Sequence, residues 1–217
     1  MNLSYGAKNI RWERSMKGEL RKKQILDGAR KLIARNGYYQ THVEDILREV
    51  KLGKGTFYLY FKNKEDLFIS ILERFLDDWE EVVLNASTDP NQKDLRSYFQ
   101  ALITRSLNFF KLNEELCNIY LRIGPGINDI FEPYIERFEQ KMLNYVTDEL
   151  QKGVQAGLFR KDMDIDVMAN IIVGAFLRIA YYYFIVKKRK RKKPSIEHIS
   201  EEFFKIITKG LQGPIVI

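Results

Sequence analysis

Apolar side chains recur at α-helical spacing in nearly every stretch of this chain between glycine, proline and other turn residues. The stretch that begins near residue 19 shows the pattern clearly, because Gly37 ends it and one face holds Ile25, Leu26, Ala29, Leu32 and Ile33. No sustained run alternates apolar and polar residues between hairpin turns, which is the pattern typical of β-strands. The chain is therefore predicted to be all-α.

Turn residues and capping residues divide the chain into nine expected helices. They cover residues 19–36, 41–50, 54–61, 64–85, 94–112, 114–122, 128–155, 164–186 and 195–209. Thr41 and Glu44 have the S/T-x-x-E spacing of a capping box at the start of the second helix, and Asn63 is the expected cap of the fourth. These helices form a small N-terminal unit and a larger unit after it.

Charge is distributed unevenly along the 217 residues. Residues 1–64 hold 15 basic and 6 acidic residues, a net charge of +9, whereas residues 65–186 hold 12 basic and 20 acidic residues, a net charge of −8. The basic segment suits a polyanion, which the acidic segment repels. Nucleic acid is therefore the first partner that the sequence predicts for the N-terminal unit.

Residue types needed for most catalytic and metal sites are scarce. Cys117 is the single cysteine, and the two histidines, His42 and His198, lie far apart in sequence. A disulfide framework, a cysteine-based zinc cluster and a histidine-dependent triad are thereby disfavoured, and no glycine-rich nucleotide loop is present. We expect no catalytic residue, no metal and no cofactor, and a location inside the cell. A helical enzyme remains an alternative, which turnover of a bound small molecule would indicate.

A helix-turn-helix pattern lies in the basic segment. The helices expected over 41–50 and 54–61 are joined by a three-residue turn containing Gly53, and in such a motif the second helix lies in the major groove of DNA. Phe57 and Phe61 are expected to face the core. The residues expected to contact phosphates or bases are Thr41, Lys54, Gly55, Thr56, Tyr58, Leu59, Tyr60 and Lys64. Packing roles for the two tyrosines, and a capping role alone for Thr41, stay open.

Several short motifs occur here in one order: Gly37-Tyr38, then Thr41 with Glu44-Asp45-Ile46, then Gly53-Lys54-Gly55-Thr56-Phe57-Tyr58-x-Tyr60-Phe61-Lys62-Asn63-Lys64-Glu65-Asp66-Leu67. With these motifs, residues 22–68 resemble the DNA-binding domain of the tetracycline-repressor (TetR) family of bacterial transcriptional regulators. One departure is the segment 47–52, where the family often has smaller residues. Beyond residue 70 the similarity is only in the number and length of the helices.

The resemblance implies a domain organisation and a function. It implies a helix-turn-helix domain over 19–66, with its motif at about 42–61, after a flexible basic arm over 1–18. Residues 67–217 would form an effector-binding domain that makes a homodimer through its last two helices. Such a protein is a cytoplasmic, ligand-responsive regulator, most often a repressor. It binds palindromic operator DNA and is released by a small hydrophobic effector. The eight residues named above are its implied DNA contacts.

The apolar segment 167–186 allows a second interpretation. Its length suffices to span a bilayer, and the basic run 187–193 that follows imitates a cytoplasmic flank, so a tail-anchored membrane protein is an alternative. Arg178 near its middle disfavours a span. A helix that is apolar on every face is also expected where it packs between its own domain and a partner subunit. We therefore expect a dimer helix without membrane contact, and a solvated loop over 187–193.

Aromatic residues are frequent in the larger unit, with 15 in the 87 positions from 98 to 184. Most must be core, and some are predicted to line an apolar effector pocket. The expected pocket residues are Phe109, Phe110, Tyr120, Arg122, Phe138, Phe176, Arg178 and Tyr181. Arg122 or Arg178 would serve an anionic group on the effector, although pairing of Arg178 with a neighbouring carboxylate is an equal alternative.

Overall fold

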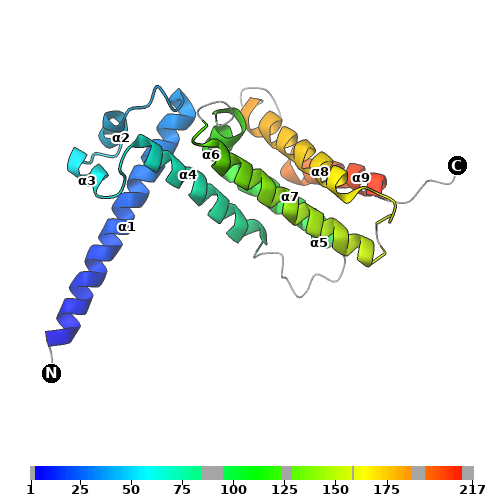
Figure 1. Ribbon diagram of the computed structural model, residues 1–217, viewed down its shortest axis with the longest axis horizontal. Coiled ribbons are helices and arrows are strands. Elements are labelled where there is room, and N and C mark those ends of the chain that lie inside the picture. The colour runs from blue at the N-terminus through cyan, green and yellow to red at the C-terminus, as the bar shows by residue number, and fades with distance from the viewer. Residues whose placement is uncertain (1–2, 85–94, 124–128, 158, 187–193, 212–217) are drawn as a thin grey trace. The chain divides into compact units, whose positions relative to one another are not determined.

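The computed structural model describes residues 3–84, 95–123, 129–157, 159–186 and 194–211. Within these ranges it contains nine α-helices, three π-helical segments and no strand (Figure 1), which confirms the all-α prediction. Two compact units are present, residues 1–73 and residues 74–217, and the boundary between them falls within one helix.

The N-terminal unit contains α1 (Leu3–Asn36), α2 (Val43–Glu49), α3 (Lys54–Tyr58) and the first part of α4 (Lys64–Trp79). The five apolar residues expected on the inner face of the first helix are all buried. Phe57 and Phe61 are buried too, at 0% and 2% exposure, which confirms that they face the core. Apolar residues of α4, including Leu67 and Phe68, complete this small core.

Three helix starts or lengths differ from the sequence-based expectation. The first helix begins at Leu3 rather than near residue 19, because residues 3–18 contain no proline and many good helix formers. The second begins at Val43 and its N-cap is His42, whose backbone N–H donates to the Asp45 carboxylate (3.3 Å), so the predicted Thr41–Glu44 capping box is wrong. The third is five residues long and ends at Tyr58.

Two predicted helix starts are confirmed by their hydrogen bonds. At α4, the Asn63 side-chain oxygen accepts from the Asp66 backbone N–H at 2.8 Å. At α8 (Ile165–Ala180), the Asp164 carboxylate accepts from the Val167 N–H at 3.0 Å. In both cases a short polar side chain satisfies a first-turn donor that has no partner within the helix.

The C-terminal unit is built from long helices that lie side by side (Figure 1). Its elements after α4 are η1 (Glu80–Leu84), α5 (Leu95–Leu112), α6 (Glu114–Asn118), η3 (Ile119–Ile123), α7 (Glu132–Gln155), α8, η4 (Tyr181–Ile185) and α9 (Ile196–Leu211). The helix α7 packs along α8, and α5 packs along α9. The π-helical segments continue α4, α6 and α8, so three expected helices each end in a wider turn.

Phe75 occupies the centre of an aromatic cluster in this unit. Its ring lies 4.5 to 5.8 Å, centroid to centroid, from the rings of Phe109, Phe110, Tyr120 and Phe138. All five side chains are at most 3% exposed. Tilted and edge-on contacts at these distances are the arrangement that aromatic rings favour, so the cluster fixes how α4, α5, η3 and α7 pack together.

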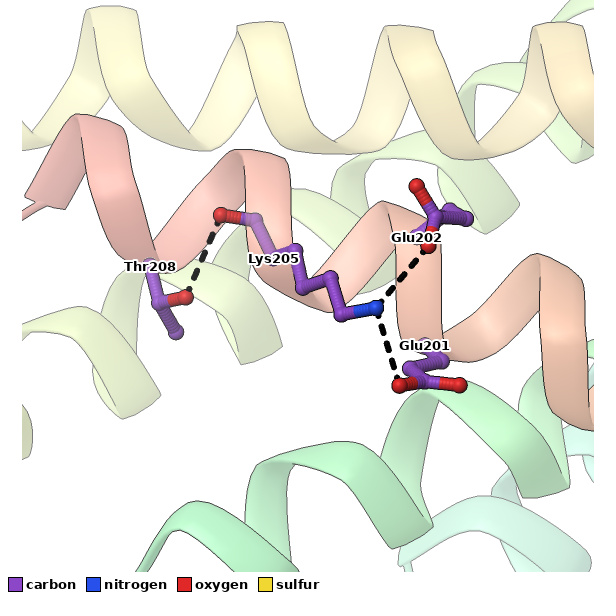
Figure 2. A network of polar contacts seen from close by, with 4 residues as sticks. All are labelled: Glu201, Glu202, Lys205 and Thr208. Atoms are coloured by element: carbon purple, nitrogen blue, oxygen red, sulfur yellow. Dashed lines mark hydrogen bonds and ion pairs between the residues drawn. The ribbon is translucent and has the colours of Figure 1, made fainter.

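The last helix is amphipathic. Its inner face buries Ile199 and Phe203, whereas Ile206 is 71% exposed and does not share that face. On the surface, the Lys205 ammonium bridges the carboxylates of Glu201 (2.9 Å) and Glu202 (3.0 Å), as Figure 2 shows. These two carboxylates raise the pKa of Lys205. The Thr208 hydroxyl is used within the helix, where it donates to the carbonyls of Phe204 and Lys205.

Candidate nucleic-acid interface and internal cavity

The turn between α2 and α3 sets the position of α3 through one unusual residue. Lys51 has φ of 54°, in the left-handed region, and is the one non-glycine residue with positive φ in the described part of the chain. Gly53 is extended, at φ of −79° and ψ of 155°, and is the N-cap of α3. The chain therefore reverses at Lys51 and enters α3 at Gly53.

Most of the predicted contact residues lie on the exposed side of α3 and the turn after it. Lys54 and Gly55 are exposed, as are Tyr58 (56%) and Leu59 (77%), while Thr56 and Tyr60 are half-buried. The Tyr58 ring lies edge-on to the buried ring of Phe57, with centroids 5.3 Å apart. Because Leu59 and Tyr60 follow α3, the exposed surface consists of one short helix and a turn, not one longer helix.

Lys54 forms an ion pair that its sequence position did not suggest. Its ammonium nitrogen lies 3.0 Å from the Glu44 carboxylate, so the side chain bridges α3 and α2. The hydrogen bond lowers the pKa of Glu44 and raises the pKa of Lys54. Both side chains are exposed. A phosphate that approaches Lys54 would compete with Glu44 for the same ammonium group.

Lys64 lies at a structural junction. Its ammonium group donates to the backbone carbonyls of Tyr38 (3.0 Å) and Thr41 (3.1 Å), and lies 4.2 Å from the centre of the Tyr38 ring. Burial lowers the pKa of Lys64. An ammonium group has three N–H donors, and the two carbonyls use two of them. Lys64 therefore ties the start of α4 to the segment that enters α2.

Thr41 differs from the other predicted contacts because it is buried, at 1% exposure. Its hydroxyl donates to the Gly37 carbonyl at 2.8 Å. Tyr38 is also buried, and burial, with help from Glu65 and Tyr39, raises the pKa of the Tyr38 phenol to about 12. These residues support the segment before α2 from inside the unit.

The N-terminus of α4 already has an acidic partner. The Asp66 carboxylate accepts from the Lys62 backbone N–H at 2.8 Å, while its own backbone N–H donates to Asn63. A helix N-terminus favours a negative group, and here Asp66 supplies one. The exposed Lys62 side chain remains beside it.

A cavity of about 120 Å³ lies inside the C-terminal unit. Side chains of α4, α5, α7, α8 and α9 form its wall, including Trp79, Leu102, Met142, Phe176 and Phe203. The wall is almost wholly apolar. The polar side chains on it are few, and include Ser106, Glu149 and Thr208. Such a lining suits a hydrophobic ligand.

The predicted pocket residues lie in several places, and of the seven whose side chains the structure describes only Phe176 lines this cavity. Four of the others, Phe109, Phe110, Tyr120 and Phe138, belong to the Phe75 cluster. Phe109 also borders a shallow surface depression beside η1. Aromatic composition predicted an apolar interior but could not distinguish a ring that fills the core from a ring that borders a space.

Arg178 and Tyr181 are two further predicted pocket residues that do not line the cavity. Arg178 is exposed on α8, and its guanidinium carbon lies 5.6 Å from the centre of the Tyr181 ring. Pairing of Arg178 with an effector or with a carboxylate stays a prediction. The side chain of Arg122 lies outside the described residues, as does the basic run 187–193.

Sequence reasoning missed the residues that define the cavity. Trp79 comes from α4, Met142 and Leu150 from α7, and Phe159 from the loop after α7. Each looks in sequence like any apolar core residue. Phe159 lies against Gly153, where an added Cβ would be 2.1 Å from the ring. The glycine inside α7 was a usable signal, because a glycine within a helix often marks a close approach.

Known proteins share both the motif and the fold. Residues 25–71 match the family model described as bacterial regulatory proteins, tetR family. The fatty acid metabolism regulator protein of Bacillus subtilis (strain 168) is 31% identical over 157 residues, covering 70% of this chain and 77% of that protein. The transcriptional repressor KstR2 of Rhodococcus jostii (strain RHA1) is 26% identical over 200 residues, covering 89% and 92%.

Two solved structures have the same fold as this chain. The fatty acid degradation regulator FadR from Bacillus halodurans superposes with a TM-score of 0.77 at 20% identity, over 88% of this chain and 96% of that chain. FadR from Bacillus subtilis in complex with stearoyl-CoA superposes with a TM-score of 0.75 at 22% identity, over 88% and 99%. The likeness extends over both units.

Proposed function

This chain belongs to the tetR family of bacterial regulatory proteins, and on that premise we propose how its two units regulate transcription. It is a DNA-binding, ligand-responsive transcriptional regulator and not an enzyme. The N-terminal unit reads operator DNA, and the C-terminal unit binds the effector and a second subunit. We propose that the DNA-binding domain covers residues 19–66, after an arm over 1–18 and before the C-terminal domain over 67–217.

The DNA-contact surface we propose consists of α3 and the turn after it. Lys54, Gly55, Thr56, Tyr58, Leu59 and Tyr60 form it, because they are exposed or half-buried on one side of a buried Phe57. The tyrosine and threonine hydroxyls and the Lys54 ammonium suit phosphate oxygens, and Leu59 suits a thymine methyl group. Thr41 and Lys64 stabilise the segment before α2, and Lys64 has one N–H left for a phosphate.

A dimer is required for this surface to read a useful length of DNA. One short helix contacts only a few base pairs, whereas two helices about 34 to 36 Å apart read both halves of a palindrome. The outer face of α8 is our proposed dimer surface. It exposes Val167 (55%) and Ile171 (58%) beside the small residues Gly174 and Ala175, which allow a close approach.

The exposed face of α8 also bears on the alternative that this chain is a tail-anchored membrane protein. Residues Ile165–Ile185 are long and apolar enough to cross a bilayer by length and composition. If a second subunit buries this face, its apolar residues are shielded from water by protein, and no bilayer is needed to explain them. The relatives described above are transcriptional regulators, and their names do not support a membrane anchor. We therefore place the protein in the cytoplasm.

The cavity in the C-terminal unit is our proposed effector site, and its apolar lining is the observation that carries this assignment. The Bacillus subtilis relative with stearoyl-CoA bound supports an effector with a long apolar chain. Trp79, on the last turn of α4, lines the cavity, and Lys64 lies on the first turn of the same helix. A ligand that shifts α4 would release DNA if it binds the DNA-free form more tightly.

Selection of binding sites from random duplex DNA tests this function. We expect a palindrome with half-sites about one helical turn apart, and lower affinity for it when stearoyl-CoA or another long-chain hydrophobic compound is added. Enrichment of no sequence would refute the regulator mechanism. A palindrome that no such compound releases would refute the effector class alone.

A further inference from the structure

The wall of the cavity includes a buried hydrogen-bond donor that has no acceptor among the described residues. Trp79 is 2% exposed, and its indole nitrogen Nε1 has no hydrogen-bond acceptor among the described residues. Trp79 also forms part of the cavity wall. A buried indole N–H normally finds an acceptor, and leaving one unpaired is unfavourable. The site therefore lacks an acceptor that a ligand could supply.

The contacts of the Trp79 ring do not replace that acceptor. Its ring packs edge-on against Phe138, at 5.6 Å between centroids, and against Tyr145, at 6.4 Å. These contacts hold the indole in place from α7. A contact between an N–H group and an aromatic face is weaker than a hydrogen bond to oxygen. An oxygen acceptor would therefore gain free energy at Nε1 even with both rings present.

Other polar groups of the wall restrict the charge of the ligand. The Glu149 carboxylate is 6% exposed and accepts from the Lys152 ammonium at 2.7 Å. The Thr208 hydroxyl already donates to the Phe204 carbonyl. A second carboxylate placed in this small apolar cavity would be repelled by Glu149. The acceptor that suits Nε1 is therefore an uncharged oxygen.

We propose that the cavity binds a mainly apolar ligand that carries one uncharged oxygen, a carbonyl or a hydroxyl, and that this oxygen accepts the Trp79 indole N–H. This inference rests on the proposed effector site and narrows its ligand class. A saturated hydrocarbon chain alone would fill the cavity but leave the indole unpaired. Trp79 thus selects chains that are oxygenated at the position facing the last turn of α4.

A matched pair of probes tests the inference, namely octane and octan-2-one, with binding measured by calorimetry on the full-length protein. The quantity of interest is the ketone-to-alkane affinity ratio, which removes the shared hydrophobic contribution. We expect this ratio to fall roughly tenfold from the wild type to Trp79→Phe, because the buried carbonyl loses its donor. In Trp12→Phe, which removes the chain's other indole and is not among the residues that line the cavity, the ratio should stay unchanged.

A second readout does not depend on the Trp79 variant folding. The chain has two tryptophans, so Trp12→Phe leaves one indole N–H resonance in the NMR spectrum. Octan-2-one should move this resonance downfield, and octane should not. If both probes bind and neither the ratio nor the resonance distinguishes them, the oxygen acceptor is refuted while the cavity stands as a hydrophobic site. If neither probe binds, the effector site and this inference both fail, whereas operator binding is measured separately.

Discussion

Lys64 illustrates how one side chain can have a structural and a binding role. Its ammonium group holds two backbone carbonyls in the segment that leads into α2. This arrangement is partly shielded from water, which strengthens hydrogen bonds to a charged donor. The family resemblance implies a DNA contact for Lys64, and the structure places its ammonium group on the carbonyls of Tyr38 and Thr41.

Lys64→Ala separates these two roles. We expect the free energy of unfolding to fall by about 1 to 2 kcal/mol, because the two carbonyls lose a charged donor. Lys62→Ala, at an exposed lysine two residues away, should change it by less than about 0.5 kcal/mol. If the third N–H of Lys64 reaches a phosphate, the slope of log affinity against log salt should shrink by about one. A lower stability with an unchanged slope would assign Lys64 to positioning only.

Tyr58 offers a test of direct contact, because its hydroxyl is exposed while its ring is held against Phe57. Tyr58→Phe keeps the ring and removes one hydrogen bond to DNA. Operator affinity should fall by about threefold to tenfold, with the melting temperature unchanged. Tyr98→Phe, in α5 of the C-terminal unit, is the control in the same anisotropy titration. If the wild type, Tyr58→Phe and Tyr98→Phe bind the operator with equal affinity, Tyr58 does not belong to the contact surface.

Tyr38 gives the N-terminal unit a dependence on alkaline pH. Burial raises its folded-state pKa from 10.0 to about 12, so above pH 10 the unfolded chain releases this proton while the folded chain keeps it. Stability is therefore lost as the pH rises from 10 toward 12. Tyr38→Phe should show a smaller loss over this interval in urea titrations at fixed pH. An identical loss in both proteins would contradict the assigned burial effect.

At the scale of elements, the turn between α2 and α3 stores strain at Lys51. A side chain in the left-handed region costs about 1 to 2 kcal/mol, which glycine avoids. Part of that gain is offset because glycine has more conformational freedom in the unfolded chain. The helix-turn-helix geometry thus depends on a strained lysine, although Gly53 is only two residues away.

Lys51→Gly should consequently raise the free energy of unfolding by roughly 0.5 to 1 kcal/mol. Arg48→Gly, inside α2, should lower it by about 1 kcal/mol, since glycine is unfavourable within a helix. Chemical denaturation of the two variants beside the wild type measures both effects. A destabilised Lys51→Gly protein would show that the lysine side chain contributes more than its backbone strain costs.

At the scale of the whole molecule, α8 has an apolar face that stays exposed to solvent when one subunit is considered alone. Val167 and Ile171 are more than half exposed on a helix whose other face is buried through Val173 and Phe176. Isolated exposed apolar residues are ordinary, but a continuous apolar stripe is typical of an interaction surface. A symmetric dimer would bury this stripe twice, once from each subunit.

Ile171→Glu should convert a dimer into a monomer in sedimentation experiments, because two-fold symmetry places the new charge in the interface twice. Operator affinity should then fall by at least a hundredfold, since only one half-site is read at a time. Leu112→Glu, at a residue that is 82% exposed at the end of α5, should remain dimeric. A dimeric Ile171→Glu protein with full affinity would place the interface elsewhere.

The sequence predicted what depends on local periodicity and on short motifs. The all-α class, the inner face of α1, the inward Phe57 and Phe61, and the Asn63 cap were all read correctly, because each depends on residues within one or two helical turns. The Thr41 cap was wrong for a similar local reason. Two overlapping capping patterns compete there, and burial of Thr41 decided in favour of His42 and Asp45.

Periodicity, charge and one contiguous motif in the sequence determined most of the helices, the basic N-terminal unit and the family. Tertiary structure alone decided which aromatic rings pack around Phe75 and which border the cavity, because both kinds of residue are equally apolar in sequence. It also decided that Lys54 forms an ion pair with Glu44, that Lys64 donates to two carbonyls, and that the Trp79 indole has no acceptor within the described part of the chain. Those contacts join residues from separate elements, and their distances are set by packing and not by spacing along the chain.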